Sequence, residues 1–310
     1  MINSLPVPLR GAAVAVLAAA ALSACGGPSS SPAGHPAPAR ATSPRPSAGD
    51  VPVLSGDYSG KLPIAAYSLT PDQSELIQSA EQKLEKKCLA RYGISYPFTR
   101  QPQTRSADRR YGLSSPKEAS AYGYHLPPSP AVSASPIPPG MLTVLMGESG
   151  KNAGSEVTYH GRAVPKGGCR AEAVERVEGE YARPNTSAAA GAIASGSYAQ
   201  SMRQPAVLAV FRRWSSCMAA SGGRRYASPM DPLDVPEFTK GHPGAREVPT
   251  AVADVECKRK TRLLPVWFGV ESRIQGAMID KQAAALSELQ RIHRAQVAEA
   301  KAVLGGGTSR

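Results

Sequence analysis

The chain has 310 residues, of which 29 are glycine and 29 are proline, and this composition argues against a single large core because proline interrupts helices and glycine adds no side chain to pack. Only one long apolar run occurs, which excludes a bundle of membrane-spanning helices. Lysine and arginine outnumber aspartate and glutamate by 36 to 24, and the resulting net charge of +12 favours anionic partners.

The first 24 residues predict an export signal. Arg10 supplies a positive start, and an apolar run of signal-peptide length follows over Gly11–Leu22. The run ends in the sequence LSAC at 22–25, which resembles the lipobox of bacterial lipoproteins. The resemblance implies that the chain is cut before Cys25 and that the Cys25 thiol carries a lipid anchor. An ordinary secretory signal and a retained membrane span are the alternatives.

Five further segments follow the signal peptide. Residues 25–55 begin with the lipidated cysteine and predict a disordered tether, because their Pro, Ser, Ala and Gly side chains have nothing to bury. A first helical unit with a long loop is expected over 56–183, and an Ala/Gly/Ser linker over 184–203. The second helical unit and a long C-terminal helix occupy 204–304, and a disordered tail occupies 305–310.

Two helices that each carry a cysteine are predicted. The first begins at a capping box formed by Thr70 and Gln73. Its apolar face recurs every four residues, at Leu76, Ala80, Leu84, Cys88 and Tyr92. The second begins at Pro205 and buries Val207, Val210, Phe211, Trp214, Cys217 and Met218. In both helices the cysteine lies five residues before a glycine that ends the helix.

Four cysteines remain besides Cys25, and an exported domain with four cysteines predicts two disulfides. Three pairings are compatible with the count, and no Cys-x-x-Cys spacing indicates a zinc site. A duplication, in which each unit holds a cysteine-bearing helix, a loop and a second cysteine-bearing helix, predicts the pairs Cys88–Cys169 and Cys217–Cys257. The alternative is two similar helices with incidental cysteines.

The segment 94–168 is expected to be mostly irregular. It contains a proline tract at 126–140 and two stretches, 116–122 and 141–146, that fit one helical turn each. Long irregular loops in compact domains are often functional. A binding surface is therefore expected at its tyrosines, Tyr111, Tyr122 and Tyr124. The alternative is that these side chains simply pack over the helices.

The sequence offers no recognisable catalytic, cofactor or metal site. The sequence GESG at 147–150 lacks the rest of a serine-protease motif, and the S-x-x-K match at 114–117 lacks its partner elements. The five histidines are scattered. Nucleic acid is excluded as a partner because the export signal removes the chain from the cytoplasm. The basic residues favour anionic lipid or wall polymer, with general solubility charge as the alternative.

Two further stretches, GGCRAEA at 167–173 and ADVECK at 253–258 before a long helix, complete a pattern with the lipobox and tether. This pattern resembles uncharacterised actinobacterial cell-envelope lipoproteins. The resemblance implies a lipid anchor on the outer face of the cell membrane and carries no activity.

The expected fold is all-α, with two helix–loop–helix units stapled by disulfides, long Pro/Gly-rich loops and a long C-terminal helix over 266–304. The expected function is a non-catalytic binding module for an envelope protein or an anionic wall polymer. An extracytoplasmic enzyme with a site in 94–168 and a transporter-associated solute-binding lipoprotein are the alternatives.

Overall fold

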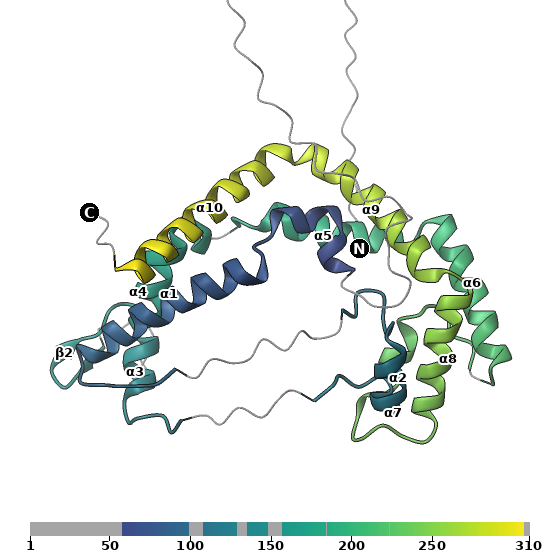
Figure 1. The fold of residues 1–310 in the computed structure, drawn as a ribbon, viewed down its shortest axis with the longest axis horizontal. Coiled ribbons are helices and arrows are strands. Elements are labelled where there is room, and N and C mark those ends of the chain that lie inside the picture. Colours follow the sequence, from purple (N-terminus) through teal and green to yellow (C-terminus); the bar gives the residue numbers. More distant parts are fainter. Residues whose placement is uncertain are drawn as a thin grey trace, which may run out of the picture. The chain divides into compact units, whose positions relative to one another are not determined.

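The computed structural model describes residues 58–98, 108–128, 135–147, 157–183, 185–222 and 224–306. The fold is all-α, as predicted (Figure 1). Among the described residues the only strands are β1 (Thr158–Tyr159) and β2 (Arg162–Ala163), which form an antiparallel hairpin. The predicted signal peptide, Cys25, the tether at 25–55 and the last residues of the tail, 307–310, lie outside the described residues.

The α-helices in chain order are α1 (Pro71–Ala90), α2 (Pro116–Tyr122), α3 (Met141–Met146), α4 (Gly168–Glu178), α5 (Ala188–Ser201), α6 (Pro205–Ala220), α7 (Pro236–Thr239), α8 (Glu247–Lys260), α9 (Leu263–Lys281) and α10 (Ala283–Gly305). Short 3-10 turns lie at Ser59–Lys61, Pro63–Tyr67, Gly179–Ala182 and Asp231–Asp234. The single turns expected at 116–122 and 141–146 are confirmed as α2 and α3.

Helix α1 begins where its capping residues dictate. The Thr70 hydroxyl accepts a hydrogen bond from the Gln73 backbone N–H at 3.2 Å, and the Gln73 side chain accepts one from the Thr70 N–H at 2.9 Å. Helix α1 packs against α4 and α10, so the first and last helices of the described chain are neighbours. A small apolar cluster at this contact includes Ile77, Val177 and Ala300.

Both predicted disulfides are confirmed. Cys88 of α1 bonds to Cys169 of α4, with 5.6 Å between their Cα atoms. Cys217 of α6 bonds to Cys257 of α8, with 5.7 Å between the Cα atoms. Cys88 and Cys217 both lie in the last turn of their helices, but Cys169 lies at the start of α4 and Cys257 near the end of α8. The duplication stays a prediction.

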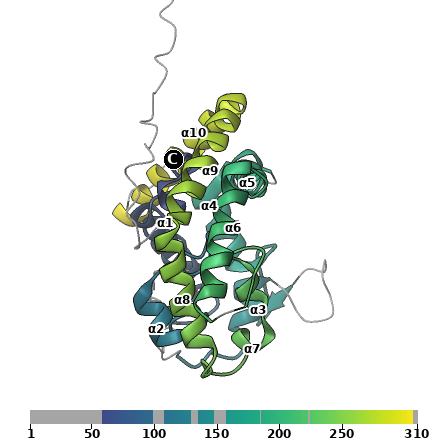
Figure 2. The same cartoon turned by 90° about the vertical axis from the view of Figure 1, so that its right-hand side faces the viewer.

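The largest core cluster lies where α5, α6 and α9 pack together. Trp214 of α6 and Trp267 of α9 are fully buried in it. The Trp267 ring lies 4.8 Å from the Phe211 ring and 4.8 Å from the Tyr111 ring, measured between centroids. Helices α6 and α8 lie side by side and are joined by their disulfide (Figure 2).

The stretch expected to be a linker, 184–203, instead contains helix α5, which packs against α9. Its small residues suit a close helix contact, because Ser197 and Ser201 are fully buried there. The Trp267 indole N–H donates to the Ser201 hydroxyl at 2.8 Å. Alanine favours the helix, and the serines supply hydrogen-bond partners for buried polar groups on α9.

The C-terminal helix expected over 266–304 is two helices rather than one. It is interrupted at Gln282, whose φ of −112° and ψ of 18° are not helical, and this residue separates α9 from α10. Residues 281–285 are exposed and contain no large apolar side chain that packing could hold. Helix α9 packs on α5 and α6, whereas α10 packs on α1 and α4, so the interruption lies between two different sets of partners.

Candidate functional site

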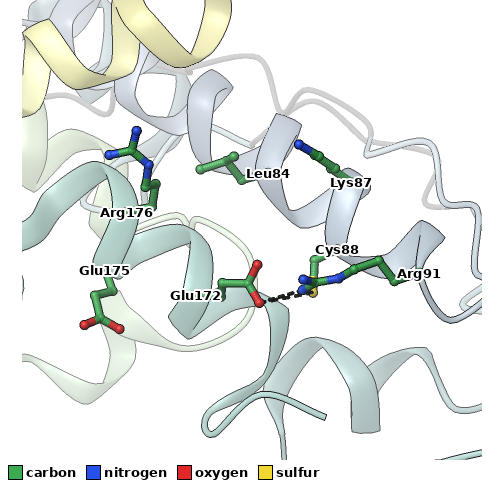
Figure 3. Close-up of a pocket in the computed structure, with 7 residues that line it drawn as sticks. All are labelled: Leu84, Lys87, Cys88, Arg91, Glu172, Glu175 and Arg176. Carbon is green, nitrogen blue, oxygen red and sulfur yellow. Dashed lines mark hydrogen bonds and ion pairs between the residues drawn. The ribbon is translucent and has the colours of Figure 1, made fainter. Parts of the chain in front are cut away.

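A surface cavity of about 540 Å³ lies between α1 and α4, beside the first disulfide (Figure 3). Its walls are charged on both sides, with a single large apolar side chain among them. The lining residues are Leu84, Lys87, Cys88, Arg91, Glu172, Glu175 and Arg176. The cavity exists because the disulfide fixes the end of α1 against the start of α4, which leaves the next turns of both helices to form its walls.

Two of the three cations in this cavity are already paired. The Arg91 guanidinium lies 2.6 Å from a Glu172 carboxylate oxygen, and the same nitrogen lies 2.8 Å from the Cys88 sulfur. Arg176 pairs with Glu299 of α10 at 2.8 Å. These contacts hold the walls of the cavity in position and leave less charge free for a ligand.

Lys87 and Glu175 differ from the other charged residues of the cavity. Both are exposed, and within the described ranges neither has an ion-pair or hydrogen-bond partner. Figure 3 shows Lys87 on α1 and Glu175 on α4, with the Glu175 carboxylate directed away from α1. The lining therefore includes a free ammonium on one helix and a free carboxylate on the other, which suits a partner that carries both signs of charge.

A second cavity, of about 570 Å³, adjoins the first through Arg91. It is lined by Arg91, Tyr92, Arg162, Ala163, Val164 and Pro165. The Arg162 side chain donates to the Arg91 carbonyl, and the Tyr92 hydroxyl donates to the Ala163 carbonyl at 2.6 Å. These bonds fasten the β-hairpin to the end of α1, and Arg91 lines both cavities.

A group of carboxylates is buried at the same α1–α4 contact. Glu85 accepts a hydrogen bond from Arg170 at 3.1 Å, and burial raises the pKa of Glu85 while Arg170 opposes that shift. Burial raises the pKa of Glu81 to about 7, and the nearby carboxylate of Glu178 adds to the increase. The contact therefore carries a carboxyl group that titrates near neutral pH.

The prediction that Tyr111 and Tyr124 form a binding surface is wrong, because their side chains are 1% and 6% exposed. The Tyr111 hydroxyl donates to the buried Glu271 carboxylate at 2.7 Å. The Tyr124 backbone N–H donates to the buried Glu247 carboxylate at 2.7 Å. Both residues thus fasten the segment 108–128 to the helices, which was the alternative. Tyr122 is half-buried.

A second buried polar group lies between α6 and α8. The Lys258 ammonium donates to the Asp254 carboxylate at 3.0 Å and to the Leu113 carbonyl at 2.7 Å. The other Asp254 oxygen accepts from the Trp214 indole N–H at 2.9 Å. Burial raises the pKa of Asp254 and lowers that of Lys258, and the attraction between the two opposes both shifts. Both side chains are fully buried, so the group holds the fold together.

The sequence does not reveal this cavity, although it predicts the helix position of Cys88, which lines the cavity. The residues Lys87, Glu172 and Glu175 look like solvated charges in the sequence, and only the packing of α1 on α4 brings them to one groove. In the part of the chain that the structure describes, His, Cys, Asp and Glu side chains form no group of three that could hold a metal ion. None of the helices described has the length and apolarity needed to cross a membrane.

Comparison with protein-family models, with curated proteins and with solved structures found nothing that matches this chain. Function is therefore argued from the cavity, the charges and the disulfides.

Proposed function

We propose that the chain is a lipoprotein anchored through Cys25 to the outer face of the cell membrane, where it acts as a non-catalytic binding module of the cell envelope. The observation that carries the proposal is the pair of disulfides, Cys88–Cys169 and Cys217–Cys257. Disulfides persist in oxidising compartments and are rare in the cytosol, so they support export. The lipobox-like sequence at 22–25 supports a lipid anchor as the form of export.

The α1–α4 cavity is the proposed contact site for the envelope partner. Its volume of about 540 Å³ falls within the range of about 300–1,000 Å³ that ligand sites occupy. Its free charges, on Lys87 and Glu175, are held on two helices that a disulfide joins, so binding need not order them first. An envelope protein that presents an acidic and a basic side chain fits these walls.

The test is affinity capture from envelope extracts with the purified full-length chain. A charge-swapped variant, Lys87→Glu with Glu175→Lys, keeps the net charge and exchanges the two walls of the cavity. The matched control, Asp280→Lys with Lys301→Glu, swaps two exposed charges on α9 and α10. We expect the wild type and the control to recover the same protein, and the cavity variant to lose it.

Capture is carried out at low salt and at about 0.5 M salt, where the screening length falls to about 4 Å and charge-dependent contacts weaken. Equal recovery by the cavity variant and the wild type contradicts the assignment of the cavity. Recovery of no protein by the wild type at low salt contradicts the binding function. Turnover of a substrate that is lost on mutation within 94–168 supports the enzyme alternative instead.

A further inference from the structure

The stretch 181–230 has an unusual charge composition. It contains no aspartate, glutamate or lysine, and six arginines, which are Arg183, Arg203, Arg212, Arg213, Arg224 and Arg225. All six are exposed. Among the described residues none of the six has a carboxylate within ion-pair distance, whereas Arg91, Arg109, Arg110, Arg170, Arg176, Arg246, Arg259 and Arg291 each have one. Within 181–230, therefore, no described arginine is neutralised by a carboxylate, although Arg162, Arg262, Arg273 and Arg294 elsewhere in the described ranges also have none.

Two of these arginines, Arg212 and Arg213, lie on α6, on the side away from its buried residues. Its apolar side is buried through Val207, Val210, Phe211, Trp214 and Met218. Arg212 and Arg213 lie in the middle of the helix, Arg203 lies just before it, and Arg224 and Arg225 follow its end. A helix dipole accounts for cations in a last turn, but it does not account for arginines at the middle of a helix or beyond it.

The second disulfide adds cations from α8 to the same region. It holds Cys217 and Cys257 with their Cα atoms 5.7 Å apart, and Arg213 precedes Cys217 by one helical turn. Lys260 follows Cys257 by one turn, and Arg262 lies at the start of α9. Both are exposed, with no carboxylate partner in the described ranges. We call the set Arg203, Arg212, Arg213, Arg224, Arg225, Lys260 and Arg262 the arginine face.

We propose that the arginine face binds a soluble polyanion whose phosphate groups are closely spaced along a chain. Guanidinium groups bind phosphate in a forked, two-bond geometry, and a polymer with closely spaced phosphates can contact several separate arginines along its length. The inference rests on the proposed envelope-binding function, and it names the partner's chemistry and a surface other than the α1–α4 cavity.

A membrane surface fits this face less well than a soluble polymer. Helices that lie on membranes bury an apolar face in the lipid beside their basic residues. The apolar face of α6 is already buried in the protein core, and Leu208 is the one large apolar side chain of α6 that is well exposed, at 41%. The face therefore provides charge without the apolar side chains that interfacial binding requires.

The test measures binding of the purified full-length chain to linear inorganic polyphosphate over a series of salt concentrations. The first variant changes Arg212, Arg213, Arg224 and Arg225 to glutamine. The control changes Lys117, Lys166, Lys281 and Lys301 to glutamine, four exposed lysines without a carboxylate partner in the described part of the chain. Both variants lose the same charge, and all replaced side chains are exposed, so both should melt at the wild-type temperature.

We expect the arginine variant to bind at least about tenfold more weakly, and the slope of log affinity against log salt to fall by about 3 because four phosphate contacts are lost. We expect the lysine control to bind within about twofold of the wild type, because its charges lie outside the face. Equal weakening in both variants overturns the proposal, since it shows a general effect of net charge. Absence of wild-type binding overturns it as well.

Vesicles of phosphatidylglycerol form a second arm of the experiment. Binding of the wild type to these vesicles without binding to polyphosphate overturns the proposal in favour of a membrane contact. The captured envelope protein tests the function separately, because Lys87 and Glu175 are unchanged in the arginine variant. If the wild type does not bind polyphosphate but still captures the envelope protein, the proposal for the arginine face is refuted and the proposed function is not.

Discussion

Replacement of Lys258 by methionine tests whether the buried ion pair holds the helices and the segment 108–128 together. Methionine keeps most of the volume and removes the ammonium. Lys258 and Asp254 are both fully buried, and the ammonium is held at 3.0 Å from Asp254 and 2.7 Å from the Leu113 carbonyl. After the change, the Asp254 carboxylate keeps the Trp214 N–H as a donor and the longer-range attraction of Arg109, but it loses the ammonium that it contacts.

A buried charge that loses its partner costs about 3–5 kcal/mol of the free energy of unfolding. For a domain of this size that corresponds to a fall in melting temperature of about 6–20 °C. The Leu113 carbonyl loses its donor in both variants. The double variant, Asp254→Leu with Lys258→Met, removes both charges, and its added cost is the unpaired Trp214 N–H, about 1–3 kcal/mol for a neutral group. Because this cost does not exceed that of a buried charge without its partner, the double variant should be no less stable than the single one.

The assay is urea unfolding of the oxidised chain, followed by circular dichroism. Arg259→Gln is the control, because Arg259, the residue after Lys258, forms an exposed ion pair with Glu256 three residues before it, and such pairs contribute at most about 1 kcal/mol. The argument that Asp254 is left as a buried charge without its partner is refuted by either of two results. One is a fall of less than about 1 kcal/mol in the free energy of unfolding of Lys258→Met, and the other is a double variant much less stable than the single one.

Two further predictions concern the disulfides and pH. The disulfides close sequence separations of 81 and 40 residues. Replacing Cys88 and Cys169 by serine should lower the free energy of unfolding by about 4.5 kcal/mol, and the same change at Cys217 and Cys257 should lower it by about 4 kcal/mol. Urea unfolding measures both values, and an unchanged midpoint in either variant contradicts the loop-closure argument. The pKa of Glu81 is raised to about 7, so its stabilising contribution is complete below pH 4.5, declines as the pH rises to about 7 and is absent above that. Glu81→Gln should therefore reduce the loss of stability between pH 5 and 8 by about 1–2 kcal/mol after allowance for solvent screening, and an unchanged pH profile contradicts it.

Local signals predicted several elements well. The Thr70 capping box marks where α1 begins, and the bounds of α2 and α3 follow from short stretches between breaking residues. The two disulfides follow from the repeated setting of Cys88 and Cys217, near the ends of their helices. These features depend on nearby residues, so the sequence carries them directly.

Features that depend on distant partners could not be predicted. Helix α5 has few large apolar side chains, and its buried Ser197 and Ser201 meet Glu271 and Trp267, some 70 residues further on. Asp254 and Lys258 have the four-residue spacing of an exposed helical pair, yet the surrounding helices and the segment 108–128 bury both. The candidate cavity likewise arises only when α1 packs on α4.

The central claim is that the chain is a lipid-anchored envelope protein. The most direct test is mass spectrometry of the N-terminal peptide of the full-length chain recovered from the membrane fraction of a bacterial host, with Cys25→Ser as the control. The account predicts that the mature chain begins at Cys25, that this residue carries a diacylglyceryl group, and that the Cys25→Ser chain is neither cut before residue 25 nor lipidated. A wild-type chain that begins elsewhere, or that carries an unmodified Cys25, would contradict the claim.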